Sequence, residues 1–339
     1  MKSIGARSPS PALGAQAPAA PSCPDQRRRR LHIAERARPS LSYAVITPVR
    51  DEAAYISRLA AALAGQVTPP AFWVIVDNGS TDTTPAVVDA FARELPWVVV
   101  RTTEGAAEAA RGAPVVRAFH LGLEALPGAV DVIVKLDADV SVAADFADDL
   151  LERFESDPGL GIVGGTCYEQ NAEGDWRAKL ASGLGVRGAC RAYRAACLRS
   201  MLPLEERLGW DTIDVATAVV WGWRIRVCDD LPFLHHRAEA AREQSGRARW
   251  TAQGAAAHYM GYRPFYLLAR ALYRAGRSPS AVWLVGGYFG SALRREPRLR
   301  HKDIVRFLRR QQSLHRLPRL IARRLRRTNP IRNAGELPS

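Results

Sequence analysis

The chain has 339 residues, of which 47% are hydrophobic and 24% are charged, a composition typical of a folded globular protein. Its formal net charge of +14 is unevenly distributed. Residues 1–40 hold eight Lys or Arg and two acids, and residues 294–327 hold fourteen and two, which leaves the stretch 41–293 mildly acidic. No helix-turn-helix, zinc-finger or RNA-binding motif accompanies the terminal arginines, so no nucleic-acid partner is expected.

Residues 1–40 are rich in Pro, Ala, Ser and Arg without periodicity, which predicts a disordered basic leader. Neither a signal peptide nor a membrane-spanning helix is predicted, because no apolar run reaches the required length. The five cysteines are odd in number and lack metal-type spacing, which indicates reduced thiols in a cytosolic protein.

Between residues 41 and 140, apolar strand-like runs alternate with segments of helical period. The predicted strands are Tyr43–Pro48, Phe72–Val76, Val98–Arg101 and Val130–Leu136. The predicted helices are Asp51–Ala64, Thr83–Glu94 and Pro114–Leu126. This alternation predicts an α/β domain with a largely parallel sheet, in which ligands bind at the carboxyl ends of the strands.

Residues 141–237 remain globular, so we place the end of the α/β domain at residue 237. The elements predicted there are helix Phe146–Phe154, strand Gly161–Gly165, helix Thr212–Trp221 and strand Ile225–Cys228. Residues 238–263 are polar and contain Arg and Gly, which predicts a mobile loop beside the active site or acceptor.

Residues 264–327 combine apolar and basic side chains, and residues 328–339 are predicted to be a disordered tail. The apolar stretches Pro264–Tyr273 and Ala281–Leu293 are too short to span a bilayer, but together they would form a hairpin in one leaflet. Leucines and isoleucines interleaved with arginines follow, which predicts amphipathic basic helices on an anionic membrane surface. A solvated basic tail is the alternative interpretation.

Acidic residues follow two of the predicted strands. Asp137 and Asp139 lie two residues apart after an apolar strand, so their side chains are expected to converge. Two neighbouring carboxylates repel each other unless a cation neutralises them, and a hard divalent ion prefers such oxygen ligands. Asp77 ends another apolar strand, where its carboxylate would accept a hydrogen bond from the imide N–H of a uracil ring. The simpler alternatives are solvated acids and an ordinary strand–turn–helix corner.

Three motifs that follow one another in a fixed order indicate a protein family more specifically than any one motif alone. They are P-V-R-D-E at residues 48–52, V-D-N-G-S-T-D at residues 76–82 and K-L-D-A-D at residues 135–139. Together they resemble the P-x-x-N-E, V-D-D-G-S-T-D and D-x-D motifs of the family 2 glycosyltransferases of the GT-A fold. The resemblance covers roughly residues 43–237. It departs at Asp51 and Asn78, which replace the usual Asn and Asp and keep a short polar side chain.

The resemblance implies a nucleotide-diphospho-sugar transferase fold, with a Rossmann-like, mostly parallel mixed sheet flanked by helices. It also implies a UDP- or GDP-linked sugar donor, a Mg²⁺ or Mn²⁺ ion and transfer with inversion. The residues carried over for the nucleotide base are Pro48, Glu52 and Asp77. Asp137 then faces the ribose and the metal, and Asp139 ligates the metal. Some GT-A enzymes use a histidine near the last core strand as a further metal ligand, and we assign this role to His236.

A fourth motif concerns catalysis. L-G-W-D-T-I-D at residues 208–214 precedes G-W-R-I at residues 222–225, where the family usually shows Gly-Glu-Asp, a helix and Gly-Tyr-x-Ile. Aligned from Gly222, Asp211 matches the Asp and Trp210 replaces the Glu. Inverting transfer needs a base for the acceptor hydroxyl proton, and we assign it to Asp211, with Asp214 as the alternative. The competing interpretation is that Asp211 only caps the helix.

Two weaker resemblances complete the pattern. Arg187–Arg194 resembles the stretch that lines the acceptor pocket. Q-S-G-R-A-R-W at residues 244–250 is similar to the Q-x-x-R-W of processive polysaccharide synthases, but its spacing differs by two residues and the flanking spanning helices are missing. This difference predicts an enzyme that adds a single sugar.

These observations predict an inverting, metal-dependent glycosyltransferase with a lipid-linked or cell-envelope glycan acceptor. It is expected in the cytoplasm, peripherally attached to the inner face of the plasma membrane. One alternative is a catalytically silent GT-A-like module that binds the membrane and partners a polysaccharide synthase, against which the intact Asp137, Asp139 and Asp211 argue. The other is a nucleic-acid-binding protein, against which the lack of a reading motif argues.

Overall fold

The computed structural model describes residues 38–104, 112–171, 174–179, 185–237, 246–276 and 278–312. Within these ranges the strands form one nine-stranded sheet in the order β3-β2-β1-β4-β8-β6-β9-β5, with β7 paired to β6. The strands are β1 (Tyr43–Val49), β2 (Phe72–Asn78), β3 (Val98–Thr103), β4 (Val132–Leu136), β5 (Val140–Val142), β6 (Leu160–Gln170), β7 (Trp176–Ala178), β8 (Cys190–Arg194) and β9 (Arg224–His235). The predicted leader up to residue 37 and the predicted tail lie outside the described residues.

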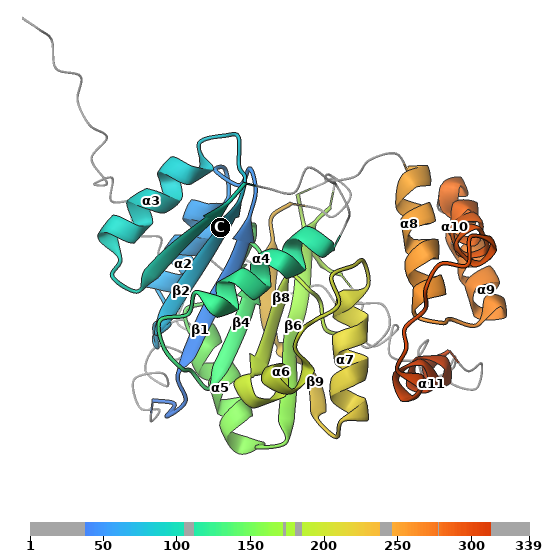
Figure 1. Ribbon diagram of the computed structural model, residues 1–339. Helices are drawn as coiled ribbons and strands as arrows, with labels where there is room; N and C mark the ends of the chain where they lie inside the picture. Colours follow the sequence, from blue (N-terminus) through green and yellow to red (C-terminus); the bar gives the residue numbers. More distant parts are fainter. Residues whose placement is uncertain are drawn as a thin grey trace, which may run out of the picture. The chain divides into compact units, whose positions relative to one another are not determined.

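Helices cover both faces of the sheet (Figure 1). On one face lie α2 (Ile56–Ala64), α3 (Thr84–Glu94) and α5 (Phe146–Ser156), and on the other lie α4 (Ala113–Glu124), α6 (Ala195–Met201) and α7 (Trp210–Val220). Neighbouring residues of a strand serve opposite faces, so in β1 Val45 packs in one core cluster and Ile46 in the other. Burial on both faces explains why the strands are apolar almost without interruption, and it confirms the predicted α/β class.

Strands β3, β2, β1 and β4 are parallel, which brings their carboxyl ends to one edge of the sheet. Strand β8, antiparallel to β4, is not among the strands predicted from the sequence. In the sequence, the charged Arg191 hides the apolar character of β8. Its side chain is nevertheless fully buried, because Asp214 pairs with it. The four described cysteines are buried and form no disulfide with one another.

Strands β6 and β9 are both longer than the strands predicted from the sequence, Gly161–Gly165 and Ile225–Cys228. They pair in parallel, and the register shifts where Gly165 faces Cys228 but the next residue, Thr166, faces Pro232. The extra residues of β9 include the exposed Asp229 and Asp230, which break the apolar pattern in the sequence. Pairing resumes after this bulge and carries β9 as far as His235.

The C-terminal part is helical, with α8 (Gly246–Tyr259), α9 (Pro264–Ala275), the 3₁₀ helix η2 (Pro279–Val282), α10 (Trp283–Leu293) and α11 (Lys302–Gln311). The predicted loop 238–263 is therefore a helix over much of its length, and residues 238–245 lie outside the described part. Helix α8 packs closely on α10, since a Cβ at Gly254 would lie 2.2 Å from the carbonyl oxygen of Leu284. The stretch Ala281–Leu293 is thus one partner in a helix pair with α8, instead of half of a hairpin with α9 alone.

Helix α11 is basic on its exposed side, but its apolar side is covered by protein. Ile304 and Leu308 are buried in a cluster with Ile213 and Ala216 of α7. The predicted contact of these apolar residues with a membrane is therefore excluded by packing. Among the described residues, no helix is both long and apolar enough to cross a membrane.

Candidate active site

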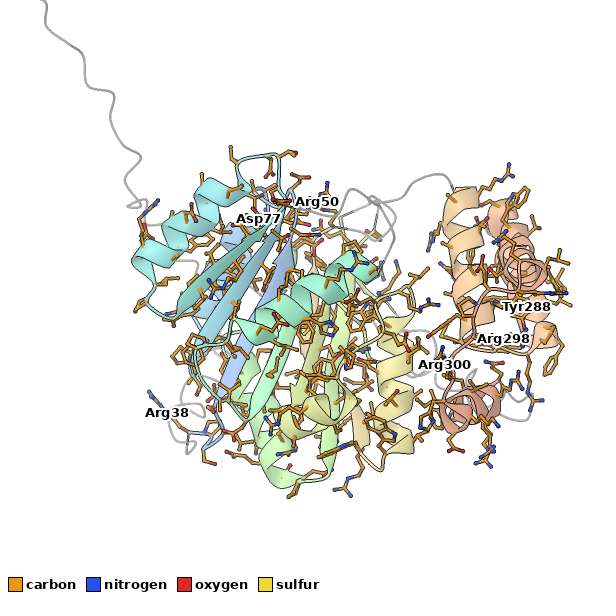
Figure 2. The ribbon with its side chains drawn as sticks, in the orientation of Figure 1. Arg38, Arg50, Asp77, Tyr288, Arg298 and Arg300 are labelled. Atoms are coloured by element: carbon orange, nitrogen blue, oxygen red, sulfur yellow. The ribbon has the colours of Figure 1, made fainter. Side chains whose placement is uncertain are left out.

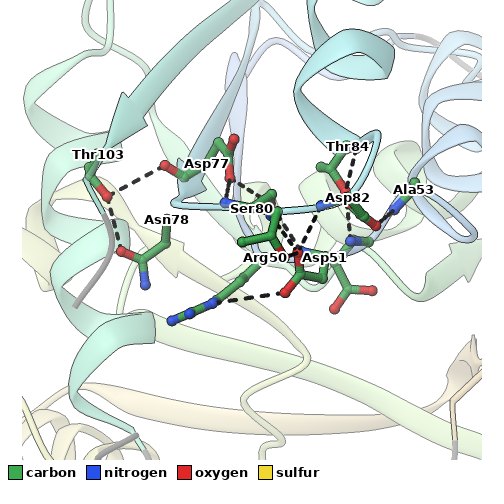
Figure 3. Close-up of polar contacts among 11 residues, drawn as sticks. Arg50, Asp51, Ala53, Asp77, Asn78, Ser80, Asp82, Thr84 and Thr103 are labelled. Atoms are coloured by element: carbon green, nitrogen blue, oxygen red, sulfur yellow. Dashed lines mark hydrogen bonds and ion pairs between the residues drawn. The ribbon is translucent and has the colours of Figure 1, made fainter. Parts of the chain in front are cut away.

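The loops after β1 and β2 are tied together by Asp51 (Figure 3). Its Oδ1 accepts hydrogen bonds from the backbone N–H groups of Thr81 (2.7 Å) and Asp82 (3.3 Å), and its own N–H donates to Ser80 Oγ (2.9 Å). Asp51 has a φ of 55°, a left-handed conformation that Asp and Asn tolerate better than other residues with a side chain. The position therefore requires a short acceptor, and the aspartate that departs from the expected asparagine supplies it.

Asp77 shapes the turn that follows β2. It is buried, and its Oδ1 accepts hydrogen bonds from the backbone N–H (3.0 Å) and Oγ (2.6 Å) of Ser80. Thr103 Oγ1 donates to Asn78 Oδ1 (3.0 Å), which joins the ends of β2 and β3. Figure 2 places Arg50 beside Asp77 at the same edge of the sheet. The contact of Asp77 with a nucleotide base stays a prediction.

Of the other two residues predicted to hold the nucleotide, one lies within β1 and the other lies in the loop that follows β1. Pro48 does not end the first strand, because it lies within β1 in register with Val76. Glu52 is buried at the start of the loop, where its N–H donates to Thr84 Oγ1 (2.8 Å). Its carboxylate pairs with Arg237, a residue directly after β9. Glu52 thereby connects the predicted nucleotide loop with the end of β9.

The carboxylate of Asp137 forms an ion pair with a buried lysine. Lys135, the fourth residue of β4, pairs through its Nζ with the Asp137 carboxylate and donates to the carbonyl oxygen of Gly188 (2.7 Å). The same Nζ lies 5.8 Å from the ring centroid of Trp210. A buried ammonium group is costly unless it is paired, so Lys135 and Asp137 stabilise each other at the end of the strand.

Asp139 is fully buried, with 0% of its surface exposed, which argues against the alternative of a solvated acid. The reason is the short strand β5, which follows it and pairs Val140 with His235 of β9. The end of β9 thereby comes to lie against Asp139, with His235 Nε2 3.4 Å from Oδ1 and Arg237 Nε 3.8 Å from Oδ2.

His235, and not His236, completes a group of possible metal ligands. One oxygen from each carboxylate of the D-x-D motif and one nitrogen of His235 lie within 4.8 Å of one another. The ring of His236 points elsewhere, with Nε2 2.7 Å from Ser141 Oγ and Nδ1 3.3 Å from Arg58 Nη1. The structure therefore brings into this group the residue before the assigned His236, since His235 is the last residue of β9 and His236 follows it.

The residues of this group fit a divalent cation. Two carboxylates and an imidazole are ordinary ligands of Mn²⁺, whereas Mg²⁺ prefers oxygen ligands alone. The Nε2 atom of His235 is buried and, in the part of the chain that the structure describes, makes no hydrogen bond. Burial alone would lower the pKa of His235, but its contacts with Asp139 and Glu169 raise that pKa to about 9. The negative charge collected around the ring therefore favours a positive group at this point.

Asp211 lies in the first turn of α7 and is connected to the D-x-D group through Gly188. The carbonyl oxygen of Gly188 binds Lys135, the ion-pair partner of Asp137, and the missing side chain of Gly188 leaves room for α7. A Cβ at Gly188 would lie 3.2 Å from the ring of Trp210 and 3.8 Å from the Cβ of Asp211. The N-cap of α7 is Gly209, so Asp211 is not a capping residue. No hydrogen bond or ion pair to its carboxylate occurs among the described residues.

The surroundings of Asp214 argue against it as the alternative base. It lies on the buried side of α7, where Arg191 Nη1 donates to its carboxylate at 2.5 Å and the hydroxyl of Tyr193 donates at 2.5 Å. Burial raises the pKa of Asp214, and the charge of Arg191 opposes that rise. The main-chain oxygen of Asp211 also accepts a hydrogen bond from Arg191 Nη2 (2.9 Å). The buried pair thus supports the helix turn that carries Asp211.

Three charged residues of the site are given no individual role by the sequence motifs: Glu169, Arg237, and Arg191, which the motifs include only as part of the stretch Arg187–Arg194. Arg191 lies between Cys190 and Ala192 in β8, and its partner Asp214 lies between Ile213 and Val215 in α7, so each charge has apolar neighbours in the sequence. A charge within an apolar segment signals a buried partner of opposite sign, which would have identified this pair. Glu169 and Arg237 have no comparable signal, because the bulge in β9 hides which residues face each other.

The class of protein follows from this arrangement. A mixed sheet with two loops and a D-x-D turn at one edge, beside a helix that carries a carboxylate, is the GT-A nucleotide-diphospho-sugar transferase fold. The chain belongs to glycosyl transferase family 2, whose model matches residues 44–226. This range includes every predicted site residue except His236, and it ends before His235.

Solved structures with a similar fold share few residues with this chain. S. aureus TarS 1-349 matches with a TM-score of 0.47 and 19% identity, over 63% of this chain and 64% of that one. The mannosyltransferase PcManGT from Pyrobaculum calidifontis matches with a TM-score of 0.49 and 18% identity, over 86% of this chain and 93% of that one. The chain thus spans slightly less than two thirds of the TarS structure. Among curated proteins, none matches the chain significantly.

Proposed function

We propose that the chain is an inverting, metal-dependent glycosyltransferase that moves one sugar from a UDP- or GDP-linked donor to a lipid-linked or cell-envelope acceptor. The position of Asp211 carries this proposal. Its carboxylate has no described polar partner, and Gly188, which packs against the turn of α7 that carries Asp211, also binds Lys135, the ion-pair partner of Asp137. A catalytically silent module has no need for a carboxylate in this position.

The described residues have separate tasks in such a transfer. Asp137, Asp139 and His235 would hold a divalent ion, which supplies positive charge for the leaving diphosphate. Asp211 accepts the proton of the acceptor hydroxyl as that oxygen attacks the anomeric carbon. The new bond joins this oxygen to the carbon, and the bond between the carbon and the diphosphate oxygen breaks on the opposite side. The configuration at the carbon is therefore inverted.

A thermal-shift screen of nucleotide sugars with Mn²⁺ and with EDTA tests the proposal. A donor that binds only the folded chain at 100 times its Kd stabilises it by about 2.7 kcal/mol. We expect a UDP- or GDP-sugar to raise the melting temperature in Mn²⁺ and to have much less effect in EDTA. The proposal fails if no nucleotide sugar shifts the transition under either condition.

The second part of the proposal is peripheral attachment to the inner face of the plasma membrane. Helices α9 and α10 expose the apolar residues Phe265, Leu268, Leu272, Tyr273, Trp283, Phe289 and Leu293. Arginines lie in and around the same helices, at positions 263, 270, 274, 294 and 295. Apolar side chains together with cations suit an interface with anionic lipid, and stable attachment usually takes both signals.

We expect the double substitution Leu272→Asp and Leu293→Asp to weaken binding to phosphatidylglycerol vesicles by at least about tenfold. These side chains are 75% and 84% exposed, and burying a leucine contributes about 1.5–3 kcal/mol. Flotation at low and high salt measures the effect. The electrostatic part should weaken at 1 M salt, where the Debye length is about 3 Å.

Two further variants separate the apolar contribution to vesicle binding from the electrostatic contribution. Leu121→Asp places the same charge on α4, where the leucine is 39% exposed, and should leave flotation unchanged. Removing residues 313–339 deletes seven arginines and should lower the salt-sensitive part only. The cut follows α11, because α11 covers the apolar side of α7. Equal binding to neutral vesicles, or tighter binding to DNA, would overturn the membrane proposal.

A further inference from the structure

The imidazole of His235 lies between two carboxylates that approach different ring nitrogens. Its Nε2 is 3.4 Å from Asp139 Oδ1, and its Nδ1 is 3.4 Å from Glu169 Oε1. The position of Glu169 follows from the sheet, because β6 and β9 are parallel neighbours in which Glu169 is the register partner of His235. Residues that are opposite each other in neighbouring strands share a face, so this contact is built into the strand pairing.

Glu169 is itself held in place by residues other than His235. It is buried, Lys179 Nζ donates to its Oε2 at 2.5 Å, and Arg187 Nη1 lies 3.9 Å from its Oε1. Lys179 follows β7, and its backbone N–H donates to the carbonyl oxygen of Cys167 in β6 (2.8 Å). The carboxylate is therefore charged and fixed in orientation on the side of the ring that faces away from Asp139.

We propose that Glu169 is a positioning residue that accepts the Nδ1–H of His235 and thereby directs Nε2 toward a divalent cation shared with Asp137 and Asp139. The inference rests on the proposed metal-dependent function and extends it to a residue outside the D-x-D group. A carboxylate behind a metal-binding histidine fixes its tautomer and ring orientation and makes its other nitrogen a better ligand. An imidazole without this partner rotates and takes up either tautomer.

A purely structural role for Glu169 makes a different prediction. Its carboxylate also neutralises Lys179 and Arg187, so its loss would lower stability even if His235 were unaffected. Stability alone therefore does not distinguish the two roles. Affinity for Mn²⁺ distinguishes them, because Lys179 pairs with Glu169 and makes no hydrogen bond or ion pair with the ring of His235 among the described contacts.

The experiment titrates Mn²⁺ into the full chain by calorimetry, with electron paramagnetic resonance to detect nitrogen coupling from a coordinated imidazole. Glu169→Gln keeps the shape of the side chain and removes its charge, and we expect the Mn²⁺ Kd to rise about 10- to 100-fold. Lys179→Gln should lower the melting temperature but change the Kd by less than about threefold. Glu124→Gln, on the exposed end of α4, is the matched surface control. His235→Ala should weaken Mn²⁺ at least as strongly and remove the nitrogen coupling.

The outcomes separate this inference from the function on which it rests. An unchanged Kd in Glu169→Gln, together with a loss in His235→Ala, would overturn the positioning role and leave the metal site intact. Equal losses in Glu169→Gln and Lys179→Gln would show a structural effect and also overturn it. Unchanged Mn²⁺ affinity in both His235→Ala and Asp139→Asn would remove the metal site itself.

Discussion

Asp211→Asn should bind the donor normally and transfer its sugar about 10²–10⁴ times more slowly, the usual effect of a missing general base. The amide has the shape of the carboxylate, so the packing of Trp210 against Gly188 is preserved. It cannot accept the proton of the acceptor hydroxyl. Transfer is measured with the donor found in the thermal-shift screen and a membrane-lipid extract as acceptor, and donor affinity is measured separately by calorimetry.

Asp214→Asn is the matched control, since it makes the same chemical change three residues later in α7. It leaves Arg191 buried without a charged partner, so we expect unfolding to become easier by about 3–5 kcal/mol. Asp211→Asn should change that free energy little. Near-normal transfer by Asp211→Asn, with none by a folded Asp214→Asn, would mean that the base has been assigned to the wrong carboxylate.

Most of the catalytic domain could be predicted because its first half obeys local rules. The runs around β1, β2 and β4 are apolar on both sides, and a helical period follows two of them. The second half contains the elements that local rules miss. Strand β8 carries the buried Arg191, and β9 is interrupted by Asp229 and Asp230, so each departs from an apolar strand for a reason that lies in another element.

The same distinction applies to the candidate site. The convergence of Asp137 and Asp139 follows from their spacing along the chain and is confirmed by the structure. The choice between His235 and His236 depends on the register of β9 against β5 and β6, which no local pattern contains. The same holds for Asp214, because its burial depends on the side chains of Arg191 and Tyr193 in a neighbouring strand. The motifs therefore do not predict which residues of distant elements contact each other.

Asp139→Asn should abolish the metal-dependent part of donor binding. We expect the Mn²⁺ affinity to fall by more than about 100-fold, beyond the range for an outer-shell partner, because a ligand atom in direct contact is lost. Asparagine is the appropriate replacement because Asp139 is fully buried against His235 and Arg237. Alanine would leave a cavity between two groups that each need a polar neighbour. Calorimetry with UDP and GDP, in Mn²⁺ and in EDTA, measures the effect, with Asp89→Asn on the surface of α3 as control.

The affinity for UDP and GDP measured in EDTA distinguishes loss of the metal ion from a wider disturbance of the nucleotide loop. In Asp139→Asn, Arg237 keeps its ion pair with Glu52, so the loop after β1 should hold its position. Metal-free binding of the nucleotide should then equal that of the unmodified chain, while the gain on adding Mn²⁺ disappears. If metal-free binding falls as well, Asp139 acts on the nucleotide loop through Arg237 and Glu52. If UDP and GDP affinities in Mn²⁺ are unchanged, Asp139 is not a metal ligand.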